Sequence, residues 1–168
     1  CNHMILALKG EFQLGIRYFR DLSEHSNLGI YYYDQKSEKW TYSKTENNQR
    51  KQILTTKLDN IEAVTIIQDL DAPIIKNTFP GNSGEYHLGD VDKILIEVDD
   101  TISGIESEEE SFTLLLNDIM LYPAFQPIKK NVTYNFDQPL KKGPHKIYFK
   151  VRDRMGNEAD ETIYFSIY

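Results

Sequence analysis

The 168-residue chain contains a single cysteine, Cys1, so no internal disulfide can form. Long apolar runs are also missing. The apolar runs that occur span only a few residues, as at Leu114–Leu116, whereas a helix that crosses a bilayer needs about 20. Basic residues are few, with 19 Lys and Arg against 26 Asp and Glu, for a net charge of −7. Because the apolar runs are short, we expect no membrane span. Because no Lys/Arg cluster offsets the negative charge, we expect no nucleic-acid partner.

The start of the chain, Cys1-Asn2-His3-Met4, has two interpretations. Residues 1–4 are either a cloning remnant ahead of Met4 or the start of a mature lipoprotein whose cysteine carries lipid. We expect the remnant and leave residues 1–4 out of the fold prediction.

Short segments with period-two alternation of apolar residues dominate the rest of the chain. Gly, Pro, Asn and Asp separate them, which is typical of strands with one face toward a core. The strands predicted in the first part are Ile5–Leu8, 12–18, 28–33, 40–43, 52–58 and 63–68, with turns at 34–39 and at Asn47-Asn48. In the second part the alternating apolar positions are 94/96/98, 112/114/116, 132/134/136, 147/149/151 and 163/165/167. We predict an all-β chain of two tandem small antiparallel β-sandwiches, Ig-like or fibronectin-III-like.

The segment Asp69–Pro73 is the predicted boundary, because Pro73 donates no backbone hydrogen bond and pushes Ala72 toward an extended conformation. Residues 5–70 then form a small module that we expect to be truncated at its N-terminus, and residues 71–168 form a second module. The acidic stretch Glu106–Glu110 predicts a solvated loop or one short helical turn.

No catalytic constellation is recognisable. The four histidines, His3, His25, His87 and His145, contain no His-x-His pair, and no nucleophile-elbow motif is present. We therefore predict that the chain is not an enzyme.

Calcium is the sharper binding hypothesis, because calcium sites collect several carboxylate and carbonyl oxygens around one ion. The candidates are two linker residues and three at strand ends: Asp69, Asp71, Asp99, Asp100 and Asp153. The alternative is that each aspartate only accepts hydrogen bonds within its own turn and that the chain has no cofactor.

Four aromatic residues on one hairpin form a candidate carbohydrate platform: Tyr31, Tyr33, Trp40 and Tyr42. Alternation requires one face of this hairpin to enter the core. We expect Trp40 to be buried, which opposes the platform.

Several turn motifs occur in a fixed order: Asp71-Ala72-Pro73, Val98-Asp99-Asp100 with Ser103-Gly104, Leu-x-x-Gly-x-His at 140–145, and Val151–Asn157. Residues 28–34 and Lys39-Trp40 precede them as an LGIYYYD and KW hairpin. In these motifs the chain resembles the bacterial immunoglobulin-like modules of secreted and surface proteins, including C-terminal extensions of M23-type zinc metallopeptidases.

This resemblance implies a non-catalytic, extracellular or cell-surface module that serves as a spacer or an interaction domain. The alternative is a calcium-assisted module that binds carbohydrate or cell wall. The implied partners are a cell-wall glycan or a surface protein.

Overall fold

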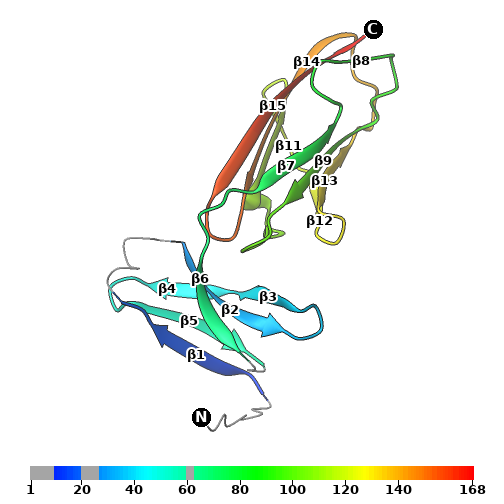
Figure 1. Cartoon of the computed structure of the whole chain (residues 1–168). Coiled ribbons are helices and arrows are strands. Elements are labelled where there is room, and N and C mark those ends of the chain that lie inside the picture. The colour runs from blue at the N-terminus through cyan, green and yellow to red at the C-terminus, as the bar shows by residue number, and fades with distance from the viewer. Residues whose placement is uncertain (1–9, 20–26, 60–62) are drawn as a thin grey trace. The chain divides into compact units, whose positions relative to one another are not determined.

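The computed structural model describes residues 10–19, 27–59 and 63–168. The chain divides into two compact units, Cys1–Asp71 and Ala72–Tyr168 (Figure 1). Cys1 and the strand predicted at Ile5–Leu8 lie outside the described residues.

The first unit contains two three-stranded antiparallel sheets (Figure 1). One sheet has the order β1-β5-β4 and the other β3-β2-β6. The strand bounds are β1 Phe12–Arg17, β2 Leu28–Asp34, β3 Lys39–Ser43, β4 Thr45–Asn48, β5 Ile53–Leu58 and β6 Val64–Gln68. The buried cluster consists of Tyr18, Leu28, Ile30 and Leu54.

The turn predicted at Asn47-Asn48 is wrong. Both residues belong to β4, and the chain reverses over the next four residues, where Lys51 N donates to Asn48 O at 3.1 Å. The Asn48 side chain also accepts from Lys51 N at 3.1 Å. Asn48 therefore opens the turn through its side chain. The left-handed conformation falls on Gln52, with φ of 54°.

The prediction that Trp40 is a core residue is also wrong, since its side chain is 43% exposed. Trp40 pairs with Tyr33, and Ser43 pairs with the fully buried Ile30. Because side chains alternate along a strand, Tyr33 and Trp40 point to the sheet face opposite Ile30. Their rings pack edge to face there, with centroids 5.4 Å apart.

The second unit is a sandwich of a five-stranded sheet, β11-β10-β14-β15-β8, and a four-stranded sheet, β12-β13-β9-β7 (Figure 1). Pairing is antiparallel except between β15 and β8, which run parallel. In the five-stranded sheet the bounds are β8 Gly84–Tyr86, β10 Phe112–Leu116, β11 Ile119–Leu121, β14 Gly143–Arg152 and β15 Glu158–Ile167. In the four-stranded sheet they are β7 Ile74–Phe79, β9 Lys93–Asp99, β12 Ala124–Gln126 and β13 Asn131–Asn135.

The core of the second unit follows the alternation in the sequence. Its twelve buried residues are Val91, Ile94, Ile96, Val98, Leu114, Val132, Ile147, Phe149, Val151, Ile163, Phe165 and Ile167. The longest ladder joins β14 and β15 over ten residue pairs, from Gly143↔Ile167 to Arg152↔Glu158. The inward residues of these two strands supply six of the twelve.

The predicted all-β fold class is confirmed. Within the acidic stretch, Glu109–Ser111 (η2) form one 3-10 turn before β10. In the part of the chain that the structure describes, no helix has the length and apolar content required to cross a membrane.

We expect residues 72–168 to fold alone and residues 5–70 to have the lower free energy of unfolding. Among the described residues, the second unit has twelve buried apolar side chains and the first unit six. Each fully buried apolar side chain contributes about 1.5–3 kcal/mol. Chemical denaturation of the separately expressed fragments, followed by circular dichroism, measures the difference. A cooperative 5–70 fragment beside an unfolded 72–168 fragment would contradict this ranking.

Candidate metal site

Asp100 starts the loop that follows β9. Its Oδ1 accepts hydrogen bonds from Ile102 N at 2.8 Å and from Gly104 N at 3.0 Å. Gly104 has φ of 76°, a left-handed conformation that glycine adopts without steric cost. The Ser-Gly of this motif therefore lets the loop fold back onto the Asp100 carboxylate.

Asp153 organises the loop between β14 and β15. Its Oδ1 accepts from Met155 N and Asn157 N, both at 2.8 Å, and its Oδ2 accepts from Asn157 Nδ2 at 2.7 Å. The residue is 4% exposed. Three donors to one buried carboxylate satisfy the polar group inside the protein.

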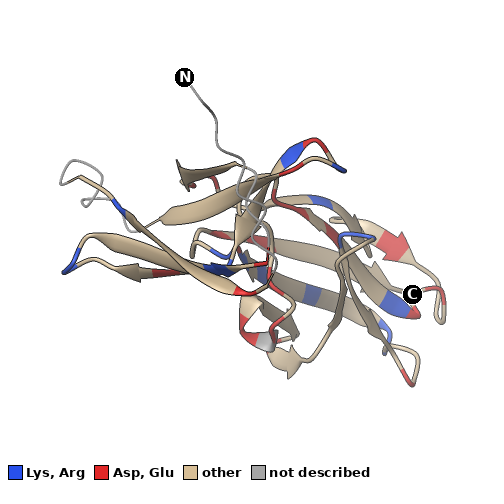
Figure 2. Ribbon diagram, turned by 90° about the horizontal axis from the view of Figure 1, so that it is seen from below, with Lys and Arg blue, Asp and Glu red and all other residues tan. Residues whose placement is uncertain are grey.

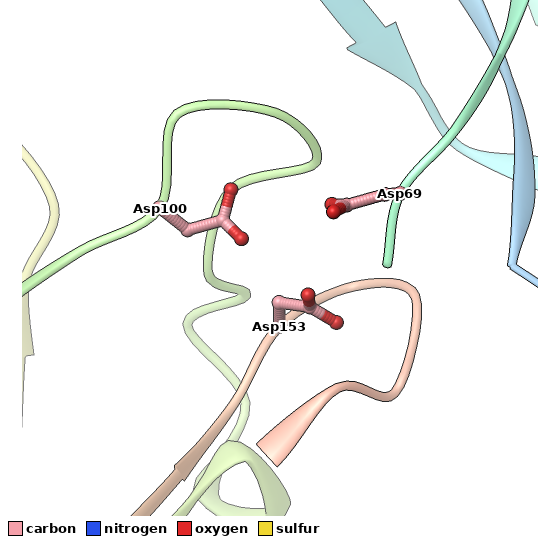
Figure 3. Close-up of side chains that lie close together, drawn as sticks. All are labelled: Asp69, Asp100 and Asp153. Carbon is pink, nitrogen blue, oxygen red and sulfur yellow. The ribbon is translucent and has the colours of Figure 1, made fainter. Parts of the chain in front are cut away.

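These two loops are held side by side within the second unit. Arg154 N donates to Gly104 O at 3.0 Å, and Ile105 forms an isolated antiparallel bridge with Asp153. The carboxylates of Asp100 and Asp153 consequently face each other, with a ligand oxygen of each within 4.8 Å of the other (Figure 3). This spacing brings both oxygens within reach of one cation.

The linker aspartates keep local hydrogen bonds in the first unit. Asp69, the third side chain drawn in Figure 3, accepts from Asp71 N through Oδ1 at 3.1 Å. Asp69 N donates to Asn27 O at 2.9 Å. Asp69 therefore closes a turn with its own side chain. This is the role that the sequence analysis gave as the alternative to calcium binding.

Asp99 is not brought together with Asp100 and Asp153. Its carboxylate instead binds Lys76 Nζ at 2.6 Å and the Nζ of Lys130. The hydrogen bond from Lys130, and then that from Lys76, lower the pKa of Asp99. Sequence reasoning missed both lysines, because they lie 23 and 31 residues away along the chain and only strand pairing places them beside β9.

The four aromatic candidates do not form a flat platform. Tyr31 is 1% exposed, and its ring packs edge to face on Tyr42 with centroids 5.5 Å apart. Tyr33 and Trp40 also pack edge to face, at an interplanar angle of 68°. A sugar face needs an exposed, flat ring, which the buried Tyr31 cannot supply.

The two described histidines have separate surroundings. His145 is 8% exposed, and its ring nitrogens lie 3.0 Å from Asn117 Nδ2 and 2.7 Å from Lys141 O. Lys141 O can only accept, so His145 Nε2 donates to it and Nδ1 accepts from Asn117. His87 lies 3.4 Å from the Tyr168 hydroxyl.

Charged residues of both signs are interspersed along the strands and loops (Figure 2). Basic residues are often directly paired, as in Lys146–Asp118 at 2.6 Å and Lys150–Glu158 at 3.2 Å. This mixed surface agrees with the acidic net charge of the chain.

No protein-family model matches the chain, and no curated protein matches it. Among solved structures, CopC from Methylosinus trichosporium OB3b is similar at 12% identity and a TM-score of 0.45, over 56% of this chain and 92% of that chain. PcoC, a methionine-rich copper resistance protein from Escherichia coli, is similar at 11% identity and a TM-score of 0.45, over 58% of this chain and 100% of that chain. At these values the likeness does not assign a ligand, so the chemistry has to come from the residues themselves.

The predicted spacer function and its carbohydrate or cell-wall binding alternative are contradicted by these neighbours, because a copper resistance protein is neither. The comparisons also give no support to an association with M23-type peptidases.

We predict that Asp99→Asn lowers the free energy of unfolding of the second unit by about 1 kcal/mol at pH 7. The folded-state pKa of Asp99 is lowered, so its ion pairs stabilise the protein above the unfolded pKa of about 3.9. This contribution disappears as the pH falls through the folded pKa. Urea denaturation of both proteins between pH 7 and about pH 2.5 should show the difference shrinking in acid. A difference that is the same at both ends would contradict the assignment.

Proposed function

We propose that the second unit is a β-sandwich module that binds a hard divalent cation, calcium, at Asp100 and Asp153. The observation that carries this proposal is the approach of the two carboxylates to within 4.8 Å on loops that are hydrogen-bonded to each other. Two like charges at this distance repel, and a cation between them converts the repulsion into attraction.

The hydrogen bonds leave room for a ligand. In the loop after β9, the backbone amides of Ile102 and Gly104 both donate to Asp100 Oδ1. Among the described residues, Asp100 Oδ2 accepts no hydrogen bond, so its lone pairs are available to a metal ion. Asp153 Oδ1 and Oδ2 accept three hydrogen bonds from loop donors, and a carboxylate offers about four lone-pair positions.

The donor atoms favour calcium over copper. Both are carboxylate oxygens, which suit magnesium and calcium, whereas thiolate, thioether and imidazole ligands favour copper. The copper resistance of PcoC is a property of that protein. Calcium also suits the predicted extracellular location, because extracellular modules bind this ion with dissociation constants of about 10⁻⁴–10⁻³ M.

The linker carboxylates stay a prediction from the sequence. Asp69 and Asp71 precede Ala72, the first residue of the second unit, by three residues and one. A calcium ion takes six to eight oxygens, so a two-carboxylate site needs further ligands from the chain or from water. Asp69→Asn tests whether the linker supplies one.

Calcium should raise the melting temperature of the full chain. At about a hundred times the dissociation constant the ion adds about 2.7 kcal/mol, which for a unit of this size corresponds to roughly 10–20 °C. Asp100→Asn should abolish the rise. The asparagine side chain keeps one oxygen to accept from Ile102 N and Gly104 N, but it lacks the negative charge and the second oxygen that would bind calcium. Differential scanning calorimetry with calcium, magnesium and copper measures the effect.

Asp90→Asn is the matched control. Asp90 also accepts a backbone hydrogen bond in its own turn, from His87 N at 3.1 Å, and lies in the same unit. This variant should keep the full response to calcium. A melting temperature unchanged by calcium in the wild type, or an equal rise in Asp100→Asn, would refute the proposal, and a rise with copper alone would replace calcium by copper.

A further inference from the structure

The five-stranded sheet of the second unit ends at β11, an edge strand with exposed apolar side chains. In the described part of the chain β11 pairs only with β10, so its other side has no partner strand. Ile119 is 68% exposed, Met120 48%, and Tyr122, which directly follows the strand, 75%. Natural edge strands are commonly guarded by charge. The opposite edge of this sheet, β8, has the exposed Glu85 at its centre, whereas β11 contains no charged residue.

The backbone of Met120 is directed away from β10. The two strands are joined by a two-residue turn, Asn117-Asp118, with φ of 49° and 65°, as a type I′ turn requires. The residues that flank such a turn, Leu116 and Ile119, exchange both backbone hydrogen bonds. Because bonded positions alternate along an antiparallel ladder, the N–H and C=O of Met120 point toward the open edge. They can therefore pair with a further strand.

An apolar row on the outer face of the sheet leads to this edge. Tyr148 of β14 pairs with Leu115 of β10, and Leu115 pairs with Met120 of β11. Paired residues share a face, and this face is opposite the one that carries the buried Leu114. Tyr148 and Leu115 are half-buried, and the row stops at the more exposed Met120. A second copy of the same edge would continue the row and cover Met120.

An antiparallel edge can be complementary to itself, because a two-fold axis relates the two strands. With the axis at Met120, this residue lies opposite Met120 of the second copy, and Ile119 lies opposite Leu121 of the second copy. All of these side chains are apolar, so no like charges are directly opposite each other. Asp118, the charged residue that precedes β11, is already paired with Lys146 at 2.6 Å. The charge pattern therefore allows two such edges to approach.

We propose that two copies of this chain form a dimer by antiparallel pairing of their β11 strands about Met120. The N–H and C=O of Met120 bond to those of Met120 in the second copy, and the two five-stranded sheets join into one continuous sheet. The Asn117-Asp118 turn and Pro123, which has no N–H, end the pairing on either side. Because the interface is short, the dimer is weak, with a dissociation constant of about 0.1–1 mM.

Sedimentation equilibrium of the full chain at up to about 2 mM protein measures the dimer. About 0.15 M salt screens the net charge of −7. Hydrogen exchange then locates the interface. The Met120 amide should exchange more slowly as the protein concentration rises, because pairing protects it. The Ile119 amide, which bonds to β10 within one chain, should change little and is the internal control.

Charge variants test the two-fold register. Met120→Glu or Met120→Lys places two like charges directly opposite each other, so each variant alone should stay monomeric at the same concentration. An equimolar mixture of the two variants places opposite charges there and should restore association to within about threefold of the wild type. Leu88→Ser removes an exposed apolar side chain just beyond β8, at the opposite edge, and is the control that should dimerise like the wild type.

A backbone variant tests the hydrogen bonds. Met120→Pro removes the outward N–H without breaking a bond to β10, and proline is tolerated on an edge whose N–H faces solvent. It should weaken the dimer about tenfold while the far-UV circular dichroism stays unchanged. The charge variants give an independent test that leaves the backbone intact.

Any of three results would overturn the proposal. The wild-type chain could remain monomeric up to about 2 mM. A wild-type dimer could keep its affinity in Met120→Glu. The equimolar mixture of charge variants could stay monomeric under conditions in which the wild type dimerises.

Discussion

The ladder between β14 and β15 is the interaction on which the second unit depends. Ten consecutive residue pairs place Ile147, Phe149 and Val151 beside Ile163 and Phe165, all of them buried. Asp153 follows Val151 by two residues, so the loop that presents its carboxylate begins where this ladder ends. Asp100 likewise follows the buried Val98 of β9. The loops that carry Asp100 and Asp153 are thus held in place by the core, and a substitution that loosens the core also moves their carboxylates.

The two units differ in how completely their interiors are filled. The second unit packs inward residues from both sheets into one continuous cluster. The first unit has a short cluster around Ile30 and Leu54, and beyond it polar groups such as Ser43 and Thr56 face the interior. Polar residues there bury less apolar area, and for this reason we expect the first unit to have the lower free energy of unfolding.

The sequence predicted the strands well because alternation is a local signal. All five alternating segments of the second unit became strands whose inward residues are buried, apart from partly buried positions such as Phe112 and Tyr134. The two wrong predictions, the turn at Asn47-Asn48 and the burial of Trp40, concern residue types that are compatible with more than one structural position. Asn48 is the last residue of β4, and its side chain accepts a hydrogen bond from the turn that follows. Trp40 lies on the hairpin face opposite Ile30 of the buried cluster and is exposed. Tertiary packing chooses between such outcomes, and single-residue preferences do not.

The candidate site shows the same division. Residue order by itself determined that Asp99, Asp100 and Asp153 lie at strand ends, because strand ends can be located from alternation and turn residues. Only the tertiary structure separated them. It directs Asp99 to Lys76 of β7 and to Lys130, which directly precedes β13, and it brings Asp100 and Asp153 together across two loops. The physical reason is that carboxylate partners lie tens of residues apart in sequence, so their distances depend on strand pairing and loop hydrogen bonds, which no local pattern specifies.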